Sequence, residues 1–285
     1  MIDPSAAIGA ELAAQEFEWT PRDVQTYNLA LGAGGEPSNP RELRYLDDTE
    51  PVVLPTFATV APTFHATEAP RVQFPGVDID LAKVVHGTQQ VTVSSPIPPA
   101  GRARTITWIT DVWDKGNAAV IVQESRTTAP DGTELWRTRS SMFARGEGGF
   151  GGERGQTTRV PLPERPADAE TTIALLPQQA LLYRMCGDRN PLHSDPEFAT
   201  SAGFSAPIQH GLCTYGMVCK AVTDTMLDGD VESVRSFEAR FAGVVYPGES
   251  LLCRIWAEDD RLVVGVFVRD RHDAPALADV VLTTR

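Results

Sequence analysis

One short stretch of this 285-residue chain holds side chains that can handle a proton or a water molecule. Asp188, Asn190 and His193 lie within six residues, and His210-Gly211 follows them at the start of an apolar segment. A carboxylate and an imidazole have reference pKa values of about 3.9 and about 6.5, so together they can hold a water, take a proton from it and return a proton elsewhere. The amide of Asn190 can orient that water or the imidazole.

Gly211 is expected to begin a buried helix, because residues 211–227 form a long and mostly apolar segment. The first backbone N–H groups of a helix have no partner inside it and lie at the positive end of its dipole. A glycine at this position lets a substrate carbonyl approach closely, as an oxyanion site requires. An acid/base pair that faces an oxyanion donor suits reactions that create an enolate, such as the addition of water across a double bond conjugated to a thioester.

Other uses of these residues are weaker on chemical grounds. A metal site built from Asp188, His193 and His210 has a thin ligand set. Neither Ser194 nor Cys186 has a base placed for nucleophilic attack. The plainest alternative is that the carboxylate caps a loop and the imidazole is an ordinary polar side chain. We therefore predict a site without metal and without cofactor.

The elements that must position this stretch occur twice along the chain. In the first half, a helix starting at Thr20-Pro21 precedes β-branched and aromatic segments between 88 and 144, which are typical of antiparallel strands. In the second half, the helix at 211–227 precedes expected strands at 236–245, 250–257, 261–270 and 276–284. An offset of 148 residues aligns the two series, with Trp108 falling on Trp256, and similarity at one fixed offset indicates a duplicated unit.

Each unit is expected to be an antiparallel sheet wrapped round a central helix, because a sheet with one apolar face needs a cover. The predicted fold class is therefore α+β, with two such units forming a double hot dog. The N-terminal helix is expected to be shortened, because the apolar segment 52–60 is brief and contains Pro55. That shortfall predicts space over the first sheet.

A change of composition near the middle of the chain suggests a boundary. Residues 146–155 are glycine-dense and residues 156–171 are polar and rich in proline, as in a linker. We predict an N-terminal unit at 1–146 that binds acyl and CoA groups, a linker at 147–171 and a catalytic unit at 172–285. The alternative for the middle segment is a long surface loop inside one domain.

Charge and hydropathy limit the classes of partner and compartment. The net charge of −13 argues against nucleic acid, which is bound by clustered cations. No run of about 18 apolar residues indicates a membrane span. The first 15 residues show no basic region followed by an apolar one, so the cytoplasm is the expected location.

The motifs also resemble a known family. GDRNPLH at 187–193, Pro207-Ile208 and HGLCT at 210–214 are similar to the signature of type 2 enoyl-CoA hydratases, which belong to the MaoC-like dehydratases. The resemblance extends into the first half through 54–57 and 148–152 and indicates the two-domain branch. It implies reversible hydration of trans-2-enoyl-CoA to (3R)-3-hydroxyacyl-CoA, an acyl-CoA thioester as substrate and a homodimer.

By this resemblance, Asp188 and His193 are the catalytic pair, with the choice of formal base left open. Asn190 is implied to support them by hydrogen bonding, and Gly211 to donate to the oxyanion. The first unit has no counterpart of the Asp/Asn/His set, so one active site per chain is expected. The role expected for that unit is to accept the acyl tail.

The same resemblance implies substrate contacts away from the motif, at His86, Gly87, Lys115 and Phe241. Lys115 would meet a CoA phosphate, and Phe241 would line the thioester pocket. A lysine in a hairpin turn and an aromatic side chain in the core are the alternatives for these two residues.

Two other functions remain open at the level of sequence. One is the same dehydratase chemistry on an acyl-carrier protein in lipid synthesis, which would need a basic docking surface. The other is a non-catalytic hot-dog subunit that binds acyl-CoA. The complete set of Asp188, Asn190, His193 and Gly211 favours an enzyme over the binder.

Overall fold

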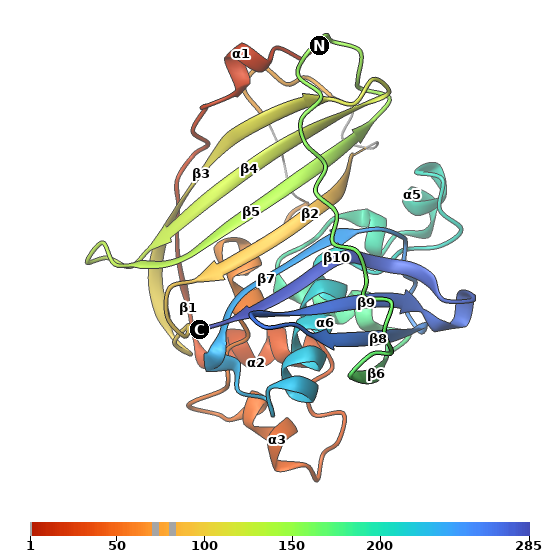
Figure 1. Ribbon diagram of the computed structural model, residues 1–285. Helices are drawn as coiled ribbons and strands as arrows, with labels where there is room; N and C mark the ends of the chain where they lie inside the picture. Colours follow the sequence, from red (N-terminus) through yellow and green to blue (C-terminus); the bar gives the residue numbers. More distant parts are fainter. Residues whose placement is uncertain (1, 70–73, 80–83) are drawn as a thin grey trace.

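The strands of the protein form one sheet made of two similar halves. The computed structural model describes residues 2–69, 74–79 and 84–285, and it has ten strands in the order β1-β3-β4-β5-β2-β7-β10-β9-β8-β6 (Figure 1). The first five strands in this order come from the first half of the chain and the last five from the second half. The two halves run through equivalent strands in mirrored order, so two units meet edge to edge at β2 and β7.

All neighbouring strands of the sheet are antiparallel, as expected. The first half provides β1 (Gln15–Trp19), β2 (Val84–Val93), β3 (Gly101–Asp114), β4 (Ala118–Thr128) and β5 (Glu134–Arg145). The second half provides β6 (Ala169–Ala174), β7 (Val234–Phe241), β8 (Ser250–Ala257), β9 (Arg261–Val268) and β10 (Ala274–Thr284). Strand β6 begins at Ala169, within the range expected as linker.

The helices are mostly short. The α-helices are α1 (Pro4–Ala7), α2 (Pro21–Ala30), α3 (Pro40–Leu43), α4 (Gln179–Tyr183), α5 (Pro196–Ser201) and α6 (Gly211–Met226). The 3-10 helices are η1 (Arg44–Leu46), η2 (Pro55–Thr59), η3 (Ala61–Thr63), η5 (Arg184–Cys186), η6 (Pro191–His193), η7 (Val231–Ser233) and η8 (Arg269–Arg271). In the described ranges, no helix combines the length and the apolar character that crossing a membrane demands.

The pairing of β2 with β7 carries the symmetry of a duplication. Gln90 lies opposite Glu238, and these two residues are 148 positions apart, which is the offset that aligns the two halves. On either side of this pair, Gln89 lies opposite Ala239 and Val91 lies opposite Phe237. Adding the offset to Gln89 gives Phe237, and subtracting it from Ala239 gives Val91, so the offset converts the first pair into the second. The two units are therefore related by a twofold axis that passes between β2 and β7.

Helix α6 is the central helix of the second unit. It lies across the concave face of the sheet formed by β7 to β10 (Figure 1). Val218, Cys219 and Val222 are fully buried and belong to the same apolar core as Phe237 of β7. Ten of its sixteen residues are buried, so the helix is anchored by packing and not by intrinsic propensity.

The cover of the first unit is built from shorter pieces, as the sequence predicts. Its apolar segment forms η2, a 3-10 helix of five residues whose Pro55 occupies an early position. Helix α2 adds a second piece; it begins after Thr20, whose backbone N–H donates to the carboxylate of Asp23 at 2.8 Å. Phe57 of η2 and Tyr27 of α2 are fully buried and pack edge to face, with ring centroids 5.5 Å apart. These features confirm the double hot-dog plan with a shortened first helix.

Candidate active site

The stretch that carries the candidate residues turns sharply at a glycine that no other residue can replace without a clash. Gly187 ends η5 with a φ of 101°, a left-handed conformation that glycine adopts readily. A Cβ built there would lie 2.0 Å from the carbonyl oxygen of Thr63. The close packing fixes where the chain leaves η5, and it therefore fixes the position of Asp188.

His193 is held so that one nitrogen is available as a base. The side chain is 9% exposed, and its Nδ1 lies 2.9 Å from the carbonyl oxygen of Ile208. A carbonyl oxygen only accepts, so Nδ1 carries the proton and the lone pair of neutral His193 is on Nε2. Burial lowers the pKa of His193, while the charge of Asp188 and the Ile208 hydrogen bond act in the opposite direction.

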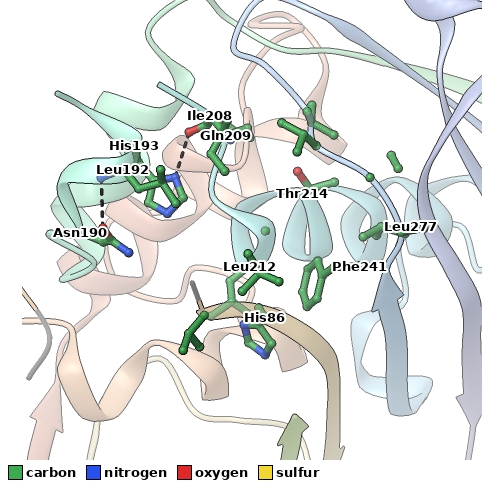
Figure 2. Close-up of a pocket in the computed structure, with 18 of the residues that line it drawn as sticks. His86, Asn190, Leu192, His193, Ile208, Gln209, Leu212, Thr214, Phe241 and Leu277 are labelled. Carbon is green, nitrogen blue, oxygen red and sulfur yellow. Dashed lines mark hydrogen bonds between the residues drawn. The ribbon is translucent and has the colours of Figure 1, made fainter. Parts of the chain in front are cut away.

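Asp188 and Asn190 form the other side of the loop. Asp188 Oδ1 accepts from the backbone N–H of Asn190 at 3.1 Å, which orients the carboxylate. Asn190 Oδ1 caps η6 by accepting from the N–H of Leu192 at 3.0 Å. Within the described residues the Asn190 amide nitrogen has no hydrogen-bond partner, and Figure 2 shows it turned away from Leu192. This nitrogen is free to donate to a bound water or substrate.

His210 lies directly behind the imidazole of His193. Its ring stacks on His193 with centroids 3.8 Å apart and 27° between the planes, and it is 1% exposed. Its Nε2 lies 3.4 Å from the backbone oxygen of Asp188. Burial, with the neighbouring His193 as a further cause, lowers the pKa of His210 to about 2, so this ring stays neutral.

The three groups form a compact cluster, with ligand-type atoms of Asp188, His193 and His210 within 4.8 Å of one another. Two rings stacked face to face hold their nitrogen lone pairs in two separate, nearly parallel planes, which disfavours convergence of both on one ion. The arrangement therefore suits the handling of a proton better than the ligation of a metal ion.

Gly211 begins α6, and its N–H has no acceptor among the described residues. A Cβ at this position would lie 2.9 Å from Cε1 of Phe241, so the ring of Phe241 packs directly on the helix start. The close approach keeps other side chains away and leaves the N–H of Gly211 open at the positive end of α6.

A pocket of about 410 Å³ connects these groups (Figure 2). The candidate residues that line it are Asp188, Asn190, His193 and Gly211. The first unit contributes Val84, Val85, His86, Ser140, Met142 and Arg145, and the strands and loop after α6 contribute Phe241, Val244, Val245, Ala276 and Leu277. The pocket is therefore shared by both units.

His86 and Gly87 occupy an irregular point of β2. The register with β5 shifts between His86 and Thr88, so Gly87 is the extra residue of a bulge, and a Cβ on it would lie 2.7 Å from Ser141 Oγ. Bulges change the direction of neighbouring side chains. His86 lines the pocket with its ring centroid 4.7 Å from that of Phe241, and burial lowers its pKa to about 4. Gly87 itself does not line the pocket.

Lys115 lies outside the pocket lining. Its Nζ is 5.0 Å from the ring centroid of Trp113 and 3.5 Å from the carbonyl oxygen of Gly155. Arg145, at the end of β5, does line the pocket and is exposed. Spacing in the sequence gives no signal for Arg145. Thr214 is another lining residue, and it could have been found from the helix period, because it lies one helical turn after Gly211.

Comparisons with known proteins agree with this architecture. A model of the MaoC like domain matches residues 159–272, and one of the MFE-2 hydratase 2 N-terminal domain matches residues 17–146. A Mycobacterium tuberculosis protein named enoyl-CoA hydratase ChsH3 is 57% identical over 281 residues, which cover 99% of this chain and 98% of that protein.

Solved structures give the same result. A MaoC-like dehydratase from Phytophthora capsici superposes with a TM-score of 0.87 at 26% identity, covering 99% of this chain and 98% of that chain. A Mycobacterium tuberculosis protein with a double hotdog fold has a TM-score of 0.57 at 11% identity, over 98% of this chain and 96% of that chain, and shares the fold alone. The chain belongs to the MaoC-like dehydratases. Within that class it is a two-domain member, with an N-terminal domain of the hydratase 2 type.

Proposed function

We propose that the protein catalyses the reversible hydration of trans-2-enoyl-CoA to (3R)-3-hydroxyacyl-CoA. One observation carries the proposal: the free lone pair of His193, the carboxylate of Asp188 and the open N–H of Gly211 line one pocket. The name and 57% identity of the Mycobacterium tuberculosis relative support the same activity.

The proposed reaction needs only these groups and one water. Asp188 and Asn190 hold the water, and His193 Nε2 takes a proton from it as its oxygen bonds to C3 of the enoyl group. The π electrons of the C2–C3 double bond move toward the thioester carbonyl, and the resulting oxyanion accepts a hydrogen bond from Gly211. C2 then takes a proton from the acid/base pair, so the net change is OH added at C3 and H added at C2.

The substrate side of the pocket is proposed to be built by both units. His86 and Phe241 would contact the thioester region, and the bulge at Gly87 would aim His86 toward it. Arg145 would meet the polar part of CoA where the pocket opens, with Lys115 lying beyond the lining residues. A CoA ester is favoured over a carrier protein, because docking of a carrier protein would need an extended basic surface and the chain has a net charge of −13, whereas a single arginine can meet a CoA phosphate.

We also propose a cytoplasmic homodimer. Leu181, Leu182 and Met185 are 36% to 54% exposed, and they lie next to α2, whose Leu29 is 51% exposed. Pairing of two chains would remove this apolar surface from water. Light scattering of the purified protein should give about twice the mass of one chain.

The direct test follows the absorbance of the conjugated thioester when purified protein is mixed with crotonyl-CoA and, separately, with a decenoyl-CoA. Loss of absorbance is expected, and the product should be oxidised by an (R)-specific but not an (S)-specific 3-hydroxyacyl-CoA dehydrogenase. Turnover of neither enoyl ester would remove the proposed function. An (S) product would contradict the proposed stereochemistry.

A further inference from the structure

Thr214 is a pocket-lining residue that the reaction as described above does not use. It is 3% exposed, lies on the first turns of α6 and lines the same pocket as Gly211 and His193. In Figure 2 its hydroxyl oxygen is turned toward the side where Gln209 and His193 lie and away from Leu277. Most of the residues that line this pocket, including Val244 and Val245, are apolar.

The hydroxyl of Thr214 lacks the partner that a buried threonine in a helix normally has. Such a hydroxyl usually donates to the backbone oxygen four residues earlier. Thr223, on the same helix, does so to Cys219 at 2.8 Å. Thr214 makes no such bond to His210, and within the described residues its hydroxyl makes no hydrogen bond at all, although its backbone N–H donates to the oxygen of His210.

Helix geometry directs this hydroxyl toward the helix start. Residues three apart share a face, and each Cα–Cβ bond tilts toward the N-terminus. The side chain of Thr214 therefore extends back toward the level of Gly211, whose N–H is also without an acceptor. Two unpartnered donors, one from the backbone and one from a buried side chain, thus face the same part of the pocket.

We propose that Thr214 is a catalytic residue whose hydroxyl is the second donor of the oxyanion site. The inference rests on the proposed hydratase function. When water oxygen bonds to C3 and electron density moves to the thioester oxygen, that oxygen accepts from both Gly211 N–H and Thr214 Oγ–H. Donors aimed at the charge that develops in the transition state stabilise it more than they stabilise the bound substrate.

The matched substitutions are Thr214→Val, which keeps the shape and removes the hydroxyl, and Thr214→Ser, which keeps the hydroxyl. Thr223→Val serves as control, because it removes a buried hydroxyl from the same helix but outside the pocket. We expect Thr214→Val to lower kcat on crotonyl-CoA by about 10- to 100-fold with little change in KM, somewhat below the usual effect of removing an oxyanion donor. Thr223→Val should stay within about threefold of the unsubstituted protein, and Thr214→Ser, which keeps the proposed donor, should retain clearly more activity than Thr214→Val.

A spectroscopic measurement separates this role from a structural one. A cinnamoyl-CoA thioester bound to the His193→Gln protein should be turned over slowly enough for its spectrum to be recorded, and hydrogen bonds to its carbonyl shift its absorbance to longer wavelength. Adding Thr214→Val to that protein should reduce the shift. An unchanged shift, an unchanged kcat in Thr214→Val, or equal losses in the valine and serine proteins would overturn the inference. The activity of the unsubstituted protein on crotonyl-CoA is measured alongside. Absence of that activity would count against the hydratase function itself, whereas the results named above count only against the role of Thr214.

Discussion

His193 and Asp188 have different surroundings, and these surroundings suggest how the two residues share the reaction. His193 is buried, and its Nδ1–H donates a hydrogen bond to the carbonyl oxygen of Ile208. One oxygen of Asp188 accepts a hydrogen bond from the backbone N–H of Asn190. Each residue therefore presents one remaining atom to the pocket. That these residues converge on one pocket could be predicted from sequence, because all of them lie in one six-residue loop; their roles stay a prediction.

Removing either member of the pair should abolish most turnover. His193→Gln loses the base, and Asp188→Asn loses the negative charge while keeping the shape of the side chain. Each should lower kcat by roughly 100-fold or more, the scale of general acid–base catalysis. The measurement is the initial rate on crotonyl-CoA, with circular dichroism to confirm folding. Near-normal rates in one variant would exclude that residue from the mechanism.

The pH dependence of the reaction should report His193. Burial lowers the pKa of this imidazole below its ordinary value of about 6.5, and only the neutral form is a base. As pH falls, His193 therefore stays neutral through pH 6.5, and kcat/KM should decline only at lower pH. Rates measured between pH 4.5 and pH 8 (roughly the range in which an imidazole titrates) test this. A midpoint at or above 6.5 on the acid side would contradict it.

At the scale of elements, the site depends on the contact between the start of α6 and strand β7. Gly211 has no room for a Cβ because Phe241 packs on it. Gly211→Ala should therefore displace the helix start or the ring and lower kcat by about 10-fold or more, given what one oxyanion donor contributes. Gly211→Ala combined with Phe241→Leu, which makes space, should recover part of that loss. Rates for the two single variants and the double variant form a cycle, and simple additivity would show that the two residues do not interact.

The elements themselves were predictable to different degrees. Helix α6 and strand β8 lie where the sequence places them, because long apolar or alternating segments carry a strong signal. Strands β1 and β6 could not be foreseen in the same way, since both are short, half-exposed strands at the two edges of the sheet. The contribution of Arg145 to the pocket was also beyond prediction, because only the folded sheet brings β5 to the catalytic loop.

At the scale of the whole molecule, the two units depend on each other. The sheet is continuous through β2 and β7, and η2 of the first unit packs against α6 of the second. The pocket has walls from both units, so loss of either would open it to water. The duplication therefore yields one pocket whose proposed catalytic groups all come from the second copy, while its walls come from both.

Stability is also expected to depend on pH through two imidazoles, the buried one of His210 and the half-buried one of His86. The folded-state pKa values of His86 and His210 are lowered to about 4 and about 2, against about 6.5 in an unfolded chain. As pH falls below about 6.5, these two histidines become protonated in the unfolded chain but stay neutral in the folded protein. The free energy of unfolding therefore decreases. Their stabilising contribution is complete above that pH and declines below it.

The effect can be assigned to one residue with His86→Gln, which cannot titrate. Urea unfolding followed by circular dichroism at pH 7.5, 6 and 5 should show the unsubstituted protein losing stability as pH falls. Between pH 6 and 5 the free energy of unfolding of the variant should fall by about 1 kcal/mol less than that of the unsubstituted protein. The reason is that each proton bound only by the unfolded chain lowers this free energy by about 1.4 kcal/mol per pH unit when its uptake is complete. Equal slopes for the two proteins would mean that His86 takes up its proton in the folded state as readily as in the unfolded chain. The lowering of the His86 pKa by burial beside Phe241 would then be absent in solution.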